Sequence, residues 1–207
     1  MRSFRWIAVL ISALLFSGCA TTSMQPARPL SDGETVTTLY LDEPGFLYIP
    51  RAGAQVTKGL GGGDVSANVS ASVWHADVGV GGRAYLSDRW SLMLQNQTAF
   101  MYEYRDGTIG WNTSMLAVRS MPPPDGWFYG GWQGGLSVVS PAANEVFSFG
   151  TTETTVTVPF IGGMMGVGPF SIGEAWTLQV ELQLSAPLTE SDAAIAPARL
   201  SVGFLRR

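Results

Sequence analysis

The stretch Trp176–Ser185, WTLQVELQLS, alternates strictly between apolar and polar side chains. Its apolar members are Trp176, Leu178, Val180, Leu182 and Leu184. An extended strand places alternate residues on opposite faces, so one face contacts an apolar medium and the other contacts polar groups. A stretch of about ten residues also suffices for a tilted strand to cross a hydrocarbon layer. The apolar face therefore meets either a protein core or lipid.

Similar short segments recur along the chain, separated by Gly, Pro and Asp residues. Together they predict an all-β domain, an antiparallel up-and-down β-barrel of about 8–10 strands. Pro159 lacks a backbone donor, so we expect either a bulge at Pro159 or two shorter strands in place of one. The strands are predicted over residues 34–41, 49–58, 65–73, 78–86, 90–104, 111–120, 127–139, 151–167, 176–185 and 197–205.

The first residues have the features of a secretion signal. Arg2 and Arg5 precede an apolar run over residues 6–16, which is too short for a stable transmembrane helix. The run ends in Ser17-Gly18-Cys19. This arrangement resembles the lipobox of bacterial lipoproteins. The alternative is an ordinary secretory signal with an incidental cysteine.

The lipobox resemblance implies that Cys19 carries acyl chains, palmitate among them, and becomes the mature N-terminus. Ala20 after the cysteine looks like the form that is sorted to the outer membrane. We therefore expect a signal peptide over residues 1–18, a flexible lipid-anchored tether over residues 19–33, and a β-barrel domain over residues 34–207. Outer-membrane lipid is then a partner through acylated Cys19.

The composition is poor in charge. Only 14% of residues are charged, against about 25% in an ordinary soluble domain, and Lys58 is the only lysine. This scarcity indicates that much of the surface does not face water. The net charge of −4 excludes nucleic acid as an expected partner, because phosphate binding needs a basic patch.

Tryptophans follow three of the predicted turns. If the lipidated end lies in the periplasm, the turns near residues 60–64, 87–89, 121–126 and 168–175 all fall on the periplasmic side, and the longer connections 140–150 and 186–196 fall outside. Trp90, Trp127 and Trp176 would then form an aromatic girdle at one membrane interface. The mature domain thus resembles a small outer-membrane β-barrel, with its wall in lipid.

Charged residues lie opposite the apolar faces of several predicted strands. If those faces meet lipid, the charges point into a narrow lumen and can fill it as Arg–Glu pairs. For Glu181 we expect Arg83 or Arg199 as the partner. The predicted lumen charges are Arg51, Arg83, Glu103, Glu153, Glu181 and Arg199.

No sequence motif specifies a catalytic site, and we expect no cofactor and no metal site. The loose dinucleotide fingerprint at Gly79–Ala84 leads into a strand and not into a helix. The sequence favours a non-enzymatic structural, adhesive or narrow-pore role in the outer membrane, with no protein partner specified.

Two other functions stay open. The first is a soluble, lipid-anchored periplasmic barrel or sandwich that binds a small lipophilic ligand. The second is a barrel enzyme that modifies lipid A acyl chains at the outer rim, as lipid A deacylases and palmitoyltransferases do. It would require Ser72 to be activated by His75, with Asp77 as the orienting group.

Overall fold

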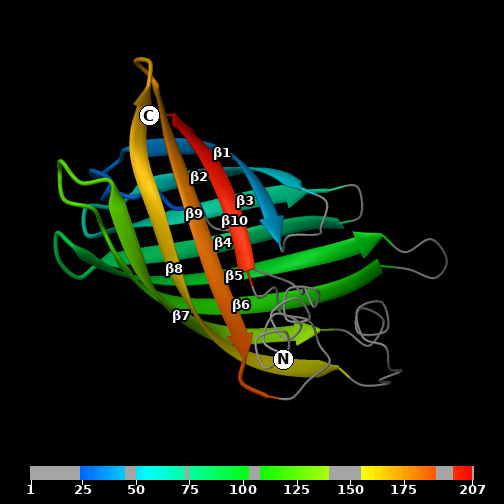
Figure 1. The fold of residues 1–207 in the computed structure, drawn as a ribbon. Helices are drawn as coiled ribbons and strands as arrows, with labels where there is room; N and C mark the ends of the chain where they lie inside the picture. The colour runs from blue at the N-terminus through cyan, green and yellow to red at the C-terminus, as the bar shows by residue number, and fades with distance from the viewer. Residues whose placement is uncertain are drawn as a thin grey trace, which may run out of the picture.

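Ten antiparallel strands close into a barrel, which confirms the predicted fold class (Figure 1). The computed structural model describes residues 24–44, 50–72, 75–102, 108–139, 155–189 and 198–206. Within these ranges no helix is long and apolar enough to cross a membrane. The strands are β1 (Thr35–Pro44), β2 (Arg51–Gly59), β3 (Gly63–Ala71), β4 (His75–Tyr85), β5 (Trp90–Tyr102), β6 (Thr108–Ser120), β7 (Phe128–Val139), β8 (Val156–Ile172), β9 (Trp176–Pro187) and β10 (Ala198–Arg206).

Each strand pairs with its neighbours in sequence, and β1 pairs with β10 to close the ring. The register sets Thr37 opposite Arg206, so the beginning of β1 and the end of β10 lie at the same end of the barrel. We call this the turn end, because the connections 60–62, 86–89, 121–127 and 173–175 lie there. The opposite end, which carries the other connections, is the loop end.

The two surfaces of the barrel wall differ sharply in chemistry. Outward positions carry large apolar side chains such as Leu94 and Trp132, which are 62% and 73% exposed. Inward positions carry buried Gln, Ser, Thr, Arg, Asp and Glu side chains, together with a smaller set of Met, Phe and Val residues. The period-2 alternation of the sequence thus becomes an apolar outer wall and a mainly polar inner wall.

Several strands extend further than the sequence predicted, β1, β4 and β8 among them. β1 continues to Pro44, beyond its predicted end at residue 41, β4 already begins at His75, and β8 runs on to Ile172. In each case pairing with a neighbour extends the strand: Asp42 lies opposite Arg51, and Ile172 lies opposite Trp176. Local turn residues alone do not reveal such cross-strand partners.

The expected bulge at Pro159 is wrong. Pro159 lies opposite Leu136 of β7 in an unbroken register, and the irregularity in β8 lies between Val167 and Phe170. Pairing between β8 and β9 ends at Phe160 and Pro187, so Pro159 lies at the end of that ladder. A missing backbone donor is tolerated there without a distortion.

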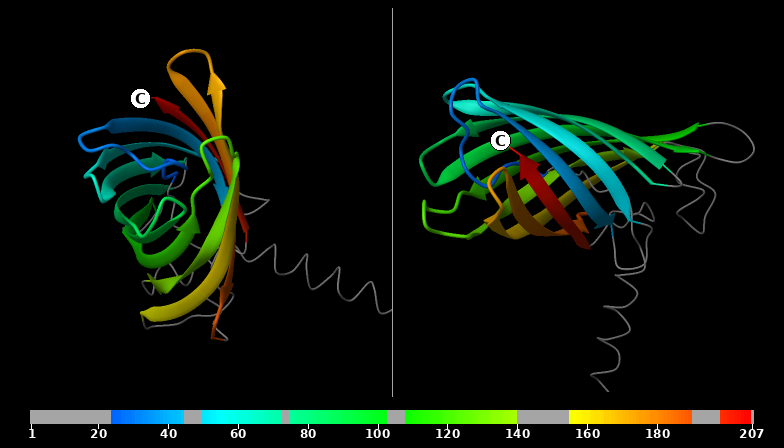
Figure 2. Two further views of the ribbon diagram at one scale, coloured as in Figure 1. Left: turned by 90° about the vertical axis from the view of Figure 1, so that its left-hand side faces the viewer. Right: turned by 90° about the horizontal axis from the view of Figure 1, so that it is seen from above.

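Residues 24–33 begin inside the ring of strands and leave it at the turn end, where β1 begins. Figure 2 shows this dark-blue segment passing inside the barrel before it joins β1. Its first residues, Met24 and Gln25, are fully buried. Met24 lies against Gly203 of β10: a Cβ atom added to Gly203 would be 2.6 Å from the Cε atom of Met24. The segment therefore reaches well inside the barrel, past the ends of the strands.

Candidate functional site

The N-terminal segment Met24–Leu30, which we call the plug, fills part of the lumen. Its backbone is held by side chains from the inner wall. Gln179 of β9 accepts a hydrogen bond from the Ala27 backbone N–H at 3.0 Å and donates one to the Gln25 carbonyl at 2.9 Å. One buried amide side chain therefore binds the plug backbone through both its donor and its acceptor.

Other wall residues complete the cradle around the plug. Gln25 Nε2 donates to the Ser66 hydroxyl at 2.6 Å, and the Leu30 N–H donates to the Tyr85 hydroxyl at 2.8 Å. These contacts come from β3 and β4, on the far side of the ring from Gln179. The plug is thus tied to strands from two parts of the wall.

Arg83 of β4 links the plug to a buried carboxylate. Its Nε donates to Asp64 Oδ2 at 2.9 Å, and its Nη1 donates to the carbonyl of Pro26 at 2.7 Å. Tyr85 also donates to Asp64 Oδ2, at 2.6 Å. Because Arg83 and Asp64 are removed from water, their hydrogen bonds compensate a desolvation cost as well as joining two elements.

Residues 24–30 therefore do not form the flexible tether that the sequence predicted. The prediction rested on polar, proline-containing residues without periodicity. Solvated linkers have the same composition. A polar segment can be buried where the surrounding wall is itself polar and satisfies the backbone groups. A small apolar cluster, Leu30 with Val36 and Leu205, packs at the point where the plug meets β1 and β10.

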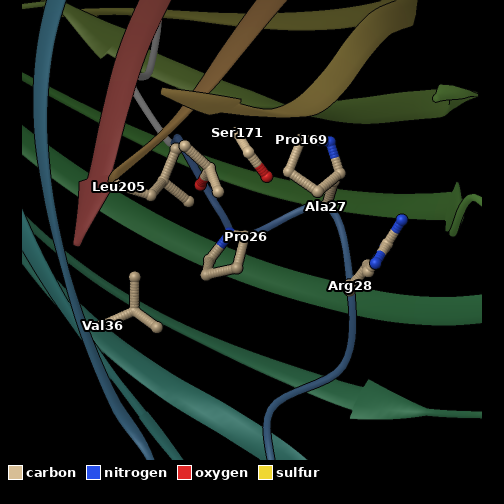
Figure 3. A pocket seen from close by; sticks show the side chains of 8 residues that line it. Pro26, Ala27, Arg28, Val36, Pro169, Ser171 and Leu205 are labelled. Carbon is tan, nitrogen blue, oxygen red and sulfur yellow. The ribbon is translucent and has the colours of Figure 1, made fainter. Parts of the chain in front are cut away.

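The plug leaves one part of the turn-end mouth unfilled. A pocket of about 230 Å³ lies between the plug and the part of the β8–β9 hairpin next to its turn (Figure 3). Pro26, Ala27 and Arg28 line it on the plug side, and Pro169 and Ser171 line it on the hairpin side. Its size suits a few water molecules better than a large ligand.

A second polar cluster lies in the loop-end half of the lumen. Arg51 of β2 forms two hydrogen bonds to Asp42, at 3.0 and 2.6 Å, and one to Asp77 at 3.0 Å. Ser70 donates to the same Asp77 oxygen at 2.9 Å. Arg199 of β10 lies 3.4 Å from Asp42. Strands β1, β2, β4 and β10 are therefore tied together by charges that face the lumen.

A third cluster joins β6, β7 and β9. The Arg119 guanidinium lies 4.3 Å from the centre of the Tyr129 ring and 3.2 Å from Glu181 Oε2. Tyr129 donates to the same Glu181 oxygen at 3.2 Å, and Gln183 donates to the other at 2.7 Å. Glu181 thus pairs with Arg119 and not with the expected Arg83 or Arg199, which are paired with Asp64 and Asp42.

The buried charges of the lumen balance within the described residues. The structure buries the predicted lumen residues Arg51, Arg83, Glu181 and Arg199. Glu103, Glu153 and the predicted lipidation site Cys19 lie outside the described residues. The inner wall has further charged members that the sequence analysis missed: Asp42, Asp64, Asp77 and Arg119.

The alternation of inward and outward residues along the strands could have placed two of the missed charges on the inner wall. Asp42 shares its parity with the inward Thr38 and Tyr40, and Arg119 shares its parity with the inward Met115. Asp42, Asp64 and Asp77 were assigned to turns or connections, because Asp is common in turns. In the structure all three lie within strands.

The three predicted girdle tryptophans lie at the turn end. Trp90 and Trp176 are the first residues of β5 and β9, and Trp127 immediately precedes β7. Trp90 and Trp127 are about half exposed, at 48% and 57%. Trp176 is less exposed, and the guanidinium of Arg206 lies 5.8 Å from the centre of its ring.

The rim residues considered for acyl chemistry, Ser72, His75 and Asp77, are described only in part. Asp77 points into the lumen and is engaged by Arg51 and Ser70. Ser72 follows the end of β3, and the side chain of His75 lies outside the described part of the structure. Among the described residues, no group of three His, Cys, Asp or Glu side chains is arranged to hold a metal ion.

No family model, curated protein or solved structure matches this chain. The arrangement itself therefore has to indicate what the molecule can do. The described geometry is that of a closed barrel with an apolar exterior, a charge-balanced interior and an internal peptide plug.

Proposed function

We propose that the chain is an outer-membrane lipoprotein, anchored through acylated Cys19, whose β-barrel lies in the bilayer in a non-enzymatic structural or adhesive role. The observation that carries this proposal is the outer wall. On the described strands the only charged outward side chains are Glu43, Lys58 and Arg206, and each lies at or next to a strand end. A water-facing barrel would distribute charges along its strands.

The inner wall and the closed ring support the same proposal. A closed antiparallel barrel satisfies its backbone groups between strands, which is what hydrocarbon demands of a spanning structure. Its charged side chains lie mainly inside, where they form Arg–Asp and Arg–Glu ion pairs. A soluble carrier of a lipophilic ligand needs the reverse arrangement, with apolar side chains around an internal cavity.

Membrane extraction tests the proposal. Cys19→Ser is combined with a signal that ordinary signal peptidase cleaves, so that the mature chain has no acyl group. We expect this protein to stay in the membrane fraction after alkaline carbonate washing and to migrate differently on a gel with and without heating. Its recovery as a soluble periplasmic protein would refute the integral barrel and favour the soluble alternative.

The plug favours a gated narrow pore as a second candidate function. Polar hydrogen bonds hold most of the plug, and water can replace them at a modest net cost per bond. In planar bilayers, the wild-type barrel should conduct little. A variant with residues 24–30 replaced by a Gly-Ser segment of equal length should conduct measurably more. Equal conductance of the two folded proteins would rule out gating by the plug.

A further inference from the structure

A hydrogen-bonded group of polar side chains lies on the outer wall between β5 and β6. Asn96 and Thr98 of β5 face Ser114 and Asn112 of β6 in the strand register. Asn96 Nδ2 donates to Asn112 Oδ1 and to the Ser114 hydroxyl, both at 2.9 Å. Asn112 Nδ2 donates to Asn96 Oδ1 at 3.1 Å and to the Thr98 hydroxyl at 2.9 Å. We call these four residues the polar quartet.

The polar quartet interrupts an apolar surface. Val80 and Val78 of β4 lie opposite Asn96 and Thr98 on one side. Leu136 and Val138 of β7 lie opposite Ser114 and Asn112 on the other. Elsewhere on the described outer wall, outward polar side chains lie near strand ends. Two amides and two hydroxyls in the middle of strands are costly against hydrocarbon, so their concentration at one place needs a cause.

Counting donors and acceptors shows what the quartet leaves free. Both N–H hydrogens of each amide are donated within the quartet. The hydroxyls of Thr98 and Ser114 only accept there, so each keeps one O–H donor without an acceptor among the described residues. Each amide oxygen accepts one bond and keeps a second acceptor site. The surface thus presents two donors beside two acceptors.

We propose that the polar quartet is an interface between two copies of this chain within the membrane. A two-fold axis places the same patch opposite itself, and a patch with equal donors and acceptors is complementary to its own copy. The hydroxyls of one copy then donate to the amide oxygens of the other, while Val80 and Leu136 pack around them. Polar contacts of this kind hold transmembrane elements together where apolar contacts cannot distinguish protein from lipid. The proposal rests on the membrane insertion proposed above.

Cysteine cross-linking tests the interface, because Cys19 is the only cysteine of the chain and is lipidated in the proposed lipoprotein. Leu116→Cys lies next to the quartet on the outward face of β6 and leaves all four polar residues intact. Oxidation of intact outer membranes should yield a disulfide-linked dimer of this variant. The matched control is Leu200→Cys, outward on β10, which should yield no dimer.

The quartet itself is tested in the same background. Adding Asn96→Leu and Asn112→Leu to the Leu116→Cys protein should lower the cross-linked fraction roughly tenfold, since several inter-chain hydrogen bonds are lost together. Cross-linking of Leu116→Cys no stronger than that of Leu200→Cys, or adducts with the mass of a different protein, would overturn the proposal. So would an undiminished dimer in the double Asn→Leu variant.

Carbonate washing and heat-dependent gel migration, measured on each variant, separate this proposal from the proposed function. A folded, membrane-retained protein without the dimer refutes the interface alone. A protein released by carbonate refutes the integral barrel and the interface with it.

Discussion

Arg83 joins the wall and the plug through one guanidinium group. It pairs with the buried Asp64 and donates to the carbonyl of Pro26. Arg83→Met should lower the free energy of unfolding by about 3–5 kcal/mol, because it leaves the Asp64 carboxylate buried without its cation. Urea titration of the refolded barrel in detergent measures this loss.

The matched control for Arg83→Met removes both charges. The double variant Arg83→Met with Asp64→Leu leaves no unpaired ion, so it should recover part of the lost stability. If the double variant is as unstable as the sum of the two single variants, the two residues are not energetically coupled and the ion pair is not what stabilises this site.

Gln179 binds the backbone of the plug, so a substitution there should loosen the plug with little effect on the rest of the barrel. Gln179→Leu removes the hydrogen bonds to Gln25 and Ala27. Two such bonds contribute about 1–3 kcal/mol, so amide exchange at Ala27 should accelerate by roughly tenfold to a hundredfold. Hydrogen–deuterium exchange with mass spectrometry measures the peptide that contains Ala27.

The control for this exchange experiment is Gln133→Leu. Gln133 is also a buried amide of the inner wall, but it donates to Ser185 and makes no hydrogen bond to the plug. Exchange at Ala27 should therefore match the wild type in this variant. Equal acceleration in both variants would mean that general loosening of the barrel, and not the loss of the Gln179 bonds, exposes the plug.

At this scale the alternation of the sequence predicts the side of the wall on which a residue lies, but not its partner. Glu181 was assigned inward from its neighbours in a clean strand, and it is buried. Its partner Arg119 comes from a strand with weak alternation, more than sixty residues earlier in the chain. Such a pair depends on how many strands separate the two residues around the ring, which local periodicity does not contain.

Two inward tyrosines lie across a strand pair from a glycine. Tyr40 of β1 lies opposite Gly53 of β2, and Tyr129 of β7 lies opposite Gly166 of β8. In both cases a Cβ on the glycine would overlap the tyrosine ring. Glycine in a strand is normally unfavourable, and an aromatic ring that covers it offsets this cost while holding the register.

Gly53→Ala should therefore destabilise the barrel. The added methyl displaces the Tyr40 ring, and overpacking of this kind costs about 1–3 kcal/mol. The temperature at which the folded gel band disappears measures the effect. Gly62→Ala is the control, since nothing lies within 4 Å of its added Cβ. If both variants melt alike, the ring contact does not stabilise the strand pair.

Strand existence could be predicted from the sequence, and strand ends could not. All ten strands match predicted segments, because turn residues and alternation are local signals. The ends of β1 and β8 are set by pairing with β2 and β9. The plug escaped prediction for a related reason: its backbone is satisfied by wall side chains distant in sequence, such as Gln179.

The molecule as a whole is apolar outside and mainly polar inside, and this inversion can be tested at one position. Leu94 lies in the middle of β5 and is 62% exposed on the outer wall. Leu94→Arg should cost about 2–4 kcal/mol if the wall is in lipid, because an arginine near the bilayer midplane is poorly solvated. In a water-soluble barrel the same exposed substitution should be nearly neutral.

The control for Leu94→Arg is Leu60→Arg in the turn between β2 and β3, where the side chain is similarly exposed. At the membrane interface this change should cost only about 0–1 kcal/mol. Unfolding from lipid vesicles compares the two variants. A Leu94→Arg barrel as stable as the Leu60→Arg barrel contradicts a lipid-facing wall.

Closure of the ring determines when the plug can be buried during biosynthesis. The plug near the start of the chain is held by Gln179, which lies 154 residues after Gln25, and β1 closes only against the final strand β10. If the chain is exported as the proposed lipoprotein, residues 24–30 therefore stay exposed until nearly the whole chain has crossed the inner membrane. In the proposed lipoprotein this delay leaves the cysteine nearby open to the enzymes that attach its acyl chains. The molecule would then receive its anchor first and bury the adjoining peptide last.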